Sequence, residues 1–260
     1  MSPSPFKVTH GYRTHATRSW FLVPLVTLAG SVGLVVSGSA GASPRPHSTH
    51  SAKLPTPASL ISAMNNAIAT MHSVHLDITA AQSSPKVNET ISQDSGYNSG
   101  SQHVSTGNER ASVLLTPSNA YLSGNSSGLS AFFALPPDDL PLVGSKWIVI
   151  KSGATQYKTF VSTIGYKSLF KNLVPTSKPL SISATTYHSA KAYAILWQIK
   201  SGTSTTKLSL YLPQTGKELP IAETTVSGTT VEQSVLSQWN KKIVVTAPTN
   251  TIAISKLHPS

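Results

Sequence analysis

Hydrophobic positions near the start of the chain recur every three or four residues, which predicts an amphipathic helix from residue 57 to about residue 71. Thr56 is placed to cap this helix, and Pro57 occupies its first turn, where a missing N–H costs nothing. The helix places its large apolar side chains on one face: Leu60, Met64, Ile68 and Met71.

The apolar period then changes to two, which is typical of a half-buried strand, first over residues 74–80. The stretch 82–110 is rich in Ser, Gln and Gly, and we expect no regular element there. Residues 111–125 form an expected hairpin around Pro117, and the rest of the chain is mostly strand and turn. Strands are expected within 145–153, 180–187, 192–200, 206–213, 218–226, 230–239 and 241–248, with a last short strand possible at 252–254.

Two further segments interrupt the strands. Residues 160–174 predict a second, shorter helix that ends before Pro175, and residues 130–135 form a short helical or irregular piece that ends at two prolines. Turn signals every 8–12 residues require no long parallel crossover. The predicted fold class is therefore α+β: a large curved antiparallel β-sheet, or half-open barrel, packed against one long N-terminal helix and one shorter helix.

The first 42 residues have the form of an export signal. Three basic residues precede the apolar run Trp20–Val36, and Ala40-Gly41-Ala42 follows as a small-residue cleavage site. The run is at the short limit for a bilayer span, so an uncleaved signal anchor is the alternative to cleavage after Ala42. We therefore expect a secreted or extracytoplasmic protein of the cell envelope, soluble or held by that anchor.

Composition divides the remainder of the chain. Residues 43–56 are a Pro/Ser/His-rich linker, residues 57–250 one domain, and residues 251–260 a C-terminal tail. The chain of 260 residues has 39% hydrophobic residues and no cysteine, so its stability must come from a packed core. Net charge is +11, but the lysines are scattered singly, which argues against a nucleic-acid partner and allows contact with an anionic membrane or cell-wall surface.

Few residues suggest catalysis or metal binding. His72 and His75, and likewise His47 and His50 in the linker, lack the further ligands of a zinc site. Asp138 and Asp139 are adjacent in a loop, where side chains usually diverge into solvent. Residues 124–128, GNSSG, match the letters of G-x-S-x-G, but we interpret them as a loop without the lysine of a phosphate cradle, and the abundance of serine does not by itself indicate a catalytic triad. We therefore expect no enzymatic activity, no cofactor and no metal.

The remaining candidates are apolar. A sheet folded over the first helix either fills its interior with side chains, giving a plain scaffold, or leaves an apolar ligand cavity. Aromatic residues on strands most often pack in cores, although some could line a cavity mouth. The candidate ligand-binding residues are Leu60, Met64, Ile68, Met71, Phe132, Phe133, Trp147, Trp197, Leu208 and Leu210.

After an exported N-terminus and a helix, the chain carries in order the segments SVHLDIT, NAYLSG, SKWIVI, LYLPQTGKELPI and SQWNKKIVVTAP. This order resembles the actinobacterial LppX/LprG-type envelope lipoproteins, which belong with the LolA-like lipoprotein carriers. The resemblance spans about residues 57–248 and implies a half-open antiparallel barrel, with helices across its mouth, that holds lipid acyl chains. One departure is clear: those relatives usually carry a lipobox cysteine, and this chain has none.

The resemblance and the residue patterns together favour an exported, non-enzymatic carrier or binding protein for a lipid or other apolar ligand. The alternative is an envelope structural or interaction protein with a filled core, which binds anionic surfaces through its basic face. Cavity binding should be nearly indifferent to salt, whereas surface binding should weaken with it.

Overall fold

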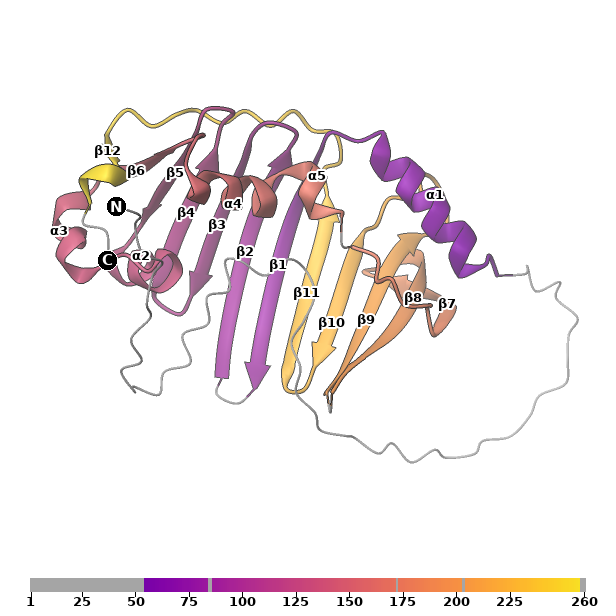
Figure 1. The fold of residues 1–260 in the computed structure, drawn as a ribbon. Helices are drawn as coiled ribbons and strands as arrows, with labels where there is room; N and C mark the ends of the chain where they lie inside the picture. The colour runs from indigo at the N-terminus through magenta and orange to yellow at the C-terminus, as the bar shows by residue number, and fades with distance from the viewer. Residues whose placement is uncertain (1–53, 84–85, 172, 203, 258–260) are drawn as a thin grey trace, which may run out of the picture.

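The computed structural model describes residues 54–83, 86–171, 173–202 and 204–257. One 12-stranded sheet forms the body of the molecule, in the order β12-β6-β5-β4-β3-β2-β1-β11-β10-β9-β8-β7. Every neighbouring pair is antiparallel except β12 and β6, which are parallel. The sheet is open and curved, with β12 and β7 at its two edges (Figure 1). The predicted fold class, α+β with a large curved antiparallel sheet, is confirmed.

The strands occupy most of the described chain. They are β1 Ser73–Ser83, β2 Lys86–Gly96, β3 Gly100–Thr106, β4 Glu109–Leu115, β5 Asn119–Gly124, β6 Trp147–Lys151, β7 Ser181–Tyr187, β8 Ala190–Ser201, β9 Ser204–Pro213, β10 Ala222–Ser227, β11 Thr230–Ser237 and β12 Thr251–Ala253. The helices are α1 Pro57–Ala69, α2 Ser126–Phe133, α3 Leu140–Val143, α4 Thr155–Ile164 and α5 Tyr166–Leu169, with 3-10 turns at Pro137–Asp139 and Ile254–Lys256.

Helix α1 forms as its sequence predicts. The side chain of Thr56 accepts a hydrogen bond from the N–H of Ser59 at 3.1 Å, and Pro57 lies in the first turn. Leu60, Met64 and Ile68 form its buried face. The predicted second helix is instead two helices, α4 and α5, because Gly165 leaves the helical conformation between them. No described helix is long and apolar enough to span a membrane.

Three local predictions were wrong. The polar stretch 82–110 contains β2, β3 and the start of β4, because ladder pairing on both sides fixes strands that lack an apolar alternation. Residues 241–248, predicted as a strand, form no ladder with the described sheet. Residues 126–128, predicted as loop, begin α2, since the Asn125 side chain accepts a hydrogen bond from the Gly128 N–H at 2.8 Å.

The C-terminal end also joins the fold. Within the stretch expected as a tail, β12 pairs with β6, and Leu257 is 5% exposed within a core cluster. The predicted signal sequence and residues 43–53 of the predicted linker, including His47 and His50, lie outside the described residues.

One face of the sheet, which we call the helix face, carries two separate apolar cores. The first core joins α1 and α5 to β1, β8, β9 and β11, and the second joins α2, α3 and α4 to β4, β5 and β6. Between them, Gln93 and Gln102 are buried on β2 and β3, and the Gln102 side-chain amide donates a hydrogen bond to the side-chain oxygen Oε1 of Gln93 at 2.7 Å. Gln93 in turn donates to Ser95 at 2.7 Å. These polar side chains divide the two cores.

Truncation of Met64 should test the first core. Met64 is fully buried among α1 and sheet residues, so Met64→Ala should lower the free energy of unfolding by about 2–5 kcal/mol. Urea unfolding measures the change. Asn65→Ala on the exposed side of the same turn is the control, and an equal loss in both variants would contradict this packing.

Candidate functional site

The predicted ligand-binding residues are mostly core residues. Of the ten, the first core contains seven: Leu60, Met64, Ile68, Met71, Trp197, Leu208 and Leu210. Phe133 packs against the second core, and Phe132 precedes it in α2. Trp147 lies on the face of β6 opposite to the buried Ile148. The structure therefore does not bring the ten residues to one place, because side chains of α1 fill the space over β8 and β9.

Part of the helix face lies away from the helices. Helices α4 and α5 cross the sheet near the start of β1 and the end of β2, whereas the β1–β2 and β10–β11 hairpins lie at the other ends of these strands (Figure 1). Toward those hairpins the ladder aligns a set of side chains that we call the hairpin strip. Its members are Ile78, Ala80, Glu89, Ile91, Glu223, Thr225, Glu232 and Ser234.

The hairpin strip mixes apolar and acidic side chains. One row across the ladder reads Leu210, Glu223, Ser234, Ile78 and Ile91. The next row reads Leu208, Thr225, Glu232, Ala80 and Glu89. Ile78 and Ile91 are only half-buried, so apolar surface remains on this part of the face.

Glu223 is the most enclosed of the three acidic groups in the hairpin strip. Its side chain is 3% exposed, and its Oε1 accepts a hydrogen bond from the Thr225 hydroxyl at 3.3 Å, while its Oε2 is buried without a hydrogen-bond partner. Burial, with the nearby charge of Glu232 as a smaller cause, raises the pKa of Glu223 to about 8. Burial and then the charge of Glu89 raise the pKa of Glu232.

Part of the hairpin strip could have been predicted from the sequence. In β11 the buried Leu236 fixes the phase of the strand, and period two then places Ser234 and Glu232 on the same face. Glu223 lacks such a guide, because only its pairing with Leu210 and Ser234 shows which face it takes.

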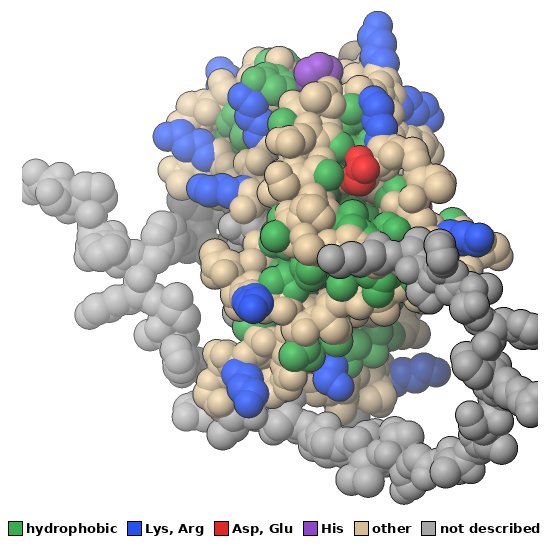
Figure 2. All heavy atoms as spheres, turned by 90° about the vertical axis from the view of Figure 1, so that its right-hand side faces the viewer, with side chains coloured by type: hydrophobic (Ala, Val, Ile, Leu, Met, Phe, Trp, Pro, Cys, Tyr) green, Lys and Arg blue, Asp and Glu red, His purple; other side chains and the backbone are tan. Residues whose placement is uncertain are grey.

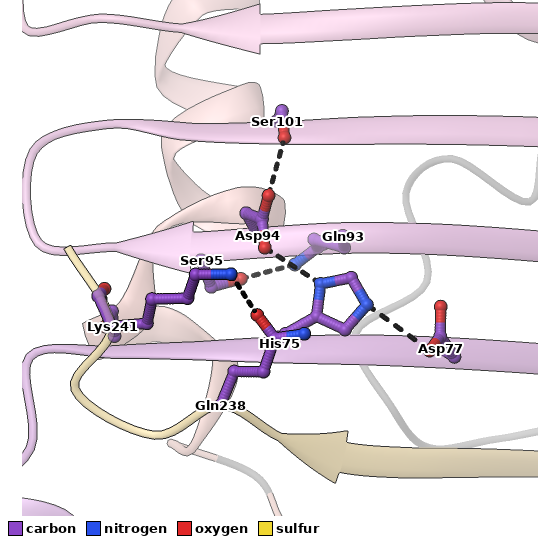
Figure 3. Close-up of polar contacts among 9 residues, drawn as sticks. His75, Asp77, Gln93, Asp94, Ser95, Ser101, Gln238 and Lys241 are labelled. Carbon is purple, nitrogen blue, oxygen red and sulfur yellow. Dashed lines mark hydrogen bonds and ion pairs between the residues drawn. The ribbon is translucent and has the colours of Figure 1, made fainter. Parts of the chain in front are cut away.

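The opposite face carries a groove of about 560 Å³. It lies between the outer ends of β1–β4 and the segment 238–246, and its lining includes His75, Asp94, Ser101, His103, Lys241 and Val244. Figure 3 shows the His75 imidazole between two carboxylates, with Nδ1 2.8 Å from Asp94 and Nε2 3.3 Å from Asp77. Because both ring nitrogens are engaged, the groove holds no free imidazole from His75.

The other sequence candidates do not assemble into a reactive centre. His72 is exposed and its backbone N–H donates to the Asn240 side chain. Asp139 is fully buried while Asp138 is exposed, so the two carboxylates do not face one another. Within the described ranges, no three His, Asp or Glu side chains converge as metal ligands.

Comparison with known proteins finds structures similar to this chain but no similar sequences. No family model matches the chain, and no curated protein matches it. LprF from Mycobacterium bovis is 9% identical with a TM-score of 0.43, over 75% of this chain and 98% of LprF. The lipoprotein LppX from Mycobacterium tuberculosis is 12% identical with a TM-score of 0.37, over 74% of this chain and all of LppX. At these values the similarity transfers no ligand, partner or activity.

The acidic groups make stability depend on pH. The folded pKa of Glu223, about 8, lies above its ordinary value of 4.5, so the folded state binds this proton more tightly than the unfolded chain. The free energy of unfolding should therefore fall as pH rises from about 4.5 to about 8, by up to about 1 kcal/mol per pH unit for this group. Urea unfolding across that range measures the slope.

The matched variants for this measurement are Glu223→Gln and Glu218→Gln. Glu223→Gln should flatten the slope and be more stable than the parent at pH 8, because the amide needs no deprotonation. Glu218→Gln, in the β9–β10 loop, should keep the parent slope. The same slope in all three proteins would show that Glu223 does not titrate in this way.

Proposed function

We propose that this protein is an extracytoplasmic, non-catalytic carrier that holds a lipid or other apolar molecule against the hairpin strip. The observation that carries the proposal is the half-buried apolar surface of Ile78, which packs against the margin of the first core, and of its ladder partner Ile91 on the same helix face. The first core has further partly buried residues at its margin, including Ile182, Tyr193 and Ile199 on β7 and β8. Such surface supports binding of an alkyl chain, since each buried methylene contributes about 0.8 kcal/mol.

The carrier would use a different part of the molecule than the sequence predicted. The buried α1 face forms a packed core with β8 and β9, so the proposed ligand lies beside that core and not within it. The proposed carrier needs no catalytic group, since association and release of an apolar molecule require no covalent bond to be broken. The predicted extracytoplasmic location remains part of this proposal.

Native mass spectrometry of the full chain, purified from its natural host, tests the proposal. We expect a stoichiometric lipid-sized adduct that organic extraction releases. Ala80→Trp should fill the hairpin strip and reduce adduct occupancy by about tenfold or more. Ala81→Trp, on the exposed opposite face of the same strand, should leave occupancy unchanged.

Two results would overturn the carrier function. One is a clean apo mass that persists after incubation with a lipid panel. The other is equal occupancy in Ala80→Trp and Ala81→Trp, which would place any bound lipid elsewhere. Circular dichroism of both variants establishes that each is folded before occupancy is compared.

The surface around α1 and β7 supports a role at an anionic surface. Figure 2 shows apolar side chains gathered on this side with Lys and Arg around them, and acidic side chains are scarce there. We include in the proposal that these basic groups bring the carrier to an anionic membrane or cell-wall polymer.

Vesicle flotation tests this part of the proposal. Binding of the full chain to vesicles that contain anionic lipid should weaken steadily as salt rises, because screening removes the attraction. Neutral vesicles of the same size are the control. Equal binding to both vesicle types, or no response to salt, would exclude the basic surface as the membrane contact.

A further inference from the structure

A segment with the sequence of a strand lies along the groove on the face opposite to the helices, yet it belongs to no ladder of the described sheet. We call residues 241–248, KKIVVTAP, the strap. The strap follows β11 and runs across the ends of the strands toward β12 (Figure 1). Its β-branched residues favour an extended chain, and its half-buried Ile243 and Val245 flank the exposed Val244.

Backbone hydrogen bonds fix the chain on either side of the strap. The Asn240 N–H donates to the Ser73 carbonyl on β1 at 3.0 Å, and the Asn250 carbonyl accepts from the Trp147 N–H on β6 at 2.9 Å. Strands β1 and β6 are five strand spacings apart in the sheet, which is about 24 Å. Ten residues cross that span only as a largely extended chain, since a helix of ten residues would reach about 15 Å.

The backbone of the strap is unpaired between these two ends. In the part of the chain that the structure describes, residues 242–248 form no backbone–backbone hydrogen bond. Side-chain packing supports the middle of the strap instead, because a Cβ atom placed on Gly96 would lie 3.3 Å from Cδ1 of Ile243. A row of free N–H and C=O groups on an extended segment is a template for pairing with another strand.

The groove follows the edge of the strap. Its lining includes the six consecutive residues 241–246, together with side chains of β1 to β4. Successive side chains of an extended chain point to opposite sides, so a groove that touches all six residues borders the backbone itself. Its volume of about 560 Å³ admits a single extended segment and excludes a folded domain. The groove therefore has room for one added strand beside the strap.

The charges of the groove select the kind of segment. Lys241 and Lys242 line it, and neither pairs with a carboxylate among the described residues. The Lys241 ammonium group donates to the uncharged Gln238 side chain at 2.8 Å. The carboxylate in the lining, Asp94, is already bound to His75 at 2.8 Å (Figure 3). The two lysines are thus available to acidic side chains of a ligand.

We propose that the strap binds an extended acidic peptide segment of a partner protein, which enters the groove as an added β-strand. Backbone hydrogen bonds to residues 242–248 provide the pairing, and Lys241 and Lys242 provide the preference for acidic side chains. Val244, which is 73% exposed, offers an apolar contact to small side chains between the acidic ones. A second copy of this chain fits less well, because its own strap lies against its own sheet and cannot enter the groove.

Titration calorimetry of the full chain with capped hexapeptides tests the pairing. The probe alternates aspartate and valine. One control peptide has lysine in place of each aspartate, and the other keeps the side chains but carries a methyl group on every backbone nitrogen. We expect the acidic peptide to bind about tenfold tighter than the lysine peptide or better, because two cations face it. The methylated peptide should not bind, since it has no N–H to donate.

Two charge variants test the lysines. Lys241→Glu/Lys242→Glu should abolish the preference for the acidic peptide. Lys200→Glu/Lys207→Glu changes the net charge by the same amount at exposed positions of β8 and β9, so it should keep the parental preference. Circular dichroism of both variants establishes that each is folded before the affinities are compared.

Hydrogen exchange on the full chain locates the bound peptide. The N–H groups of residues 242–247 should exchange quickly in the free protein and slow by about tenfold or more with the acidic peptide bound. The edge strands β7 and β12 should exchange at the same rate in both states.

Four results would overturn the inference. They are protection of β7 or β12 in place of the strap, equal binding of the acidic and lysine peptides, binding of the methylated peptide, and no binding of the acidic peptide at millimolar concentration. If the full chain alone sediments as a dimer with a protected strap, the occupant is a second copy and the peptide is wrong. The groove and the hairpin strip lie on opposite faces, so none of these results depends on the proposed carrier function.

Discussion

The ladder between β1 and β11 is the constraint on which the rest of the structure depends. It pairs Leu76 with Leu236 and continues through Ala81 and Val231, so it joins β1, the first strand in the sequence, to β11, the last of the antiparallel strands. On one side of this ladder lie β2 to β6 with β12, and on the other lie β7 to β10. Without it, two smaller sheets would each expose an edge. The hairpin strip exists because this ladder sets strands from both halves side by side.

Register then decides which side chains share a face. Because side chains alternate along a strand, a slip of one residue between β1 and β11 would exchange the two faces of one half. The present register puts Leu76 and Leu236 into the first core and, nearer the hairpins, brings Glu232 next to Ala80. The same periodicity thus produces a packed core at one end of the strands and an acidic, half-apolar surface at the other.

Buried polar groups give the helix face its internal boundaries. Gln93 and Gln102 satisfy one another between the two cores, and Gln93 also reaches the carbonyl of Thr163 at 3.4 Å in α4. The Tyr166 hydroxyl donates to the carbonyl of Ile68 at 2.8 Å, which ties α5 to α1. Such pairs cost little once every partner is present, and they fix where each helix sits. Glu223 is different in kind, because one of its oxygens has no such partner.

The sequence by itself determined the local elements with strong periods: helix α1 with its Thr56 cap, most strands after residue 180, and hence the α+β class. It could not show β2 and β3, whose polar residues become strands only through pairing on both sides, nor the division of the predicted second helix at Gly165. The candidate site shows the same limit, because apolar periodicity identifies buried residues and cannot distinguish a filled core from a ligand surface. Only the tertiary structure put Glu89, Glu223 and Glu232 together, since their proximity depends on a ladder between strands that lie far apart in the chain.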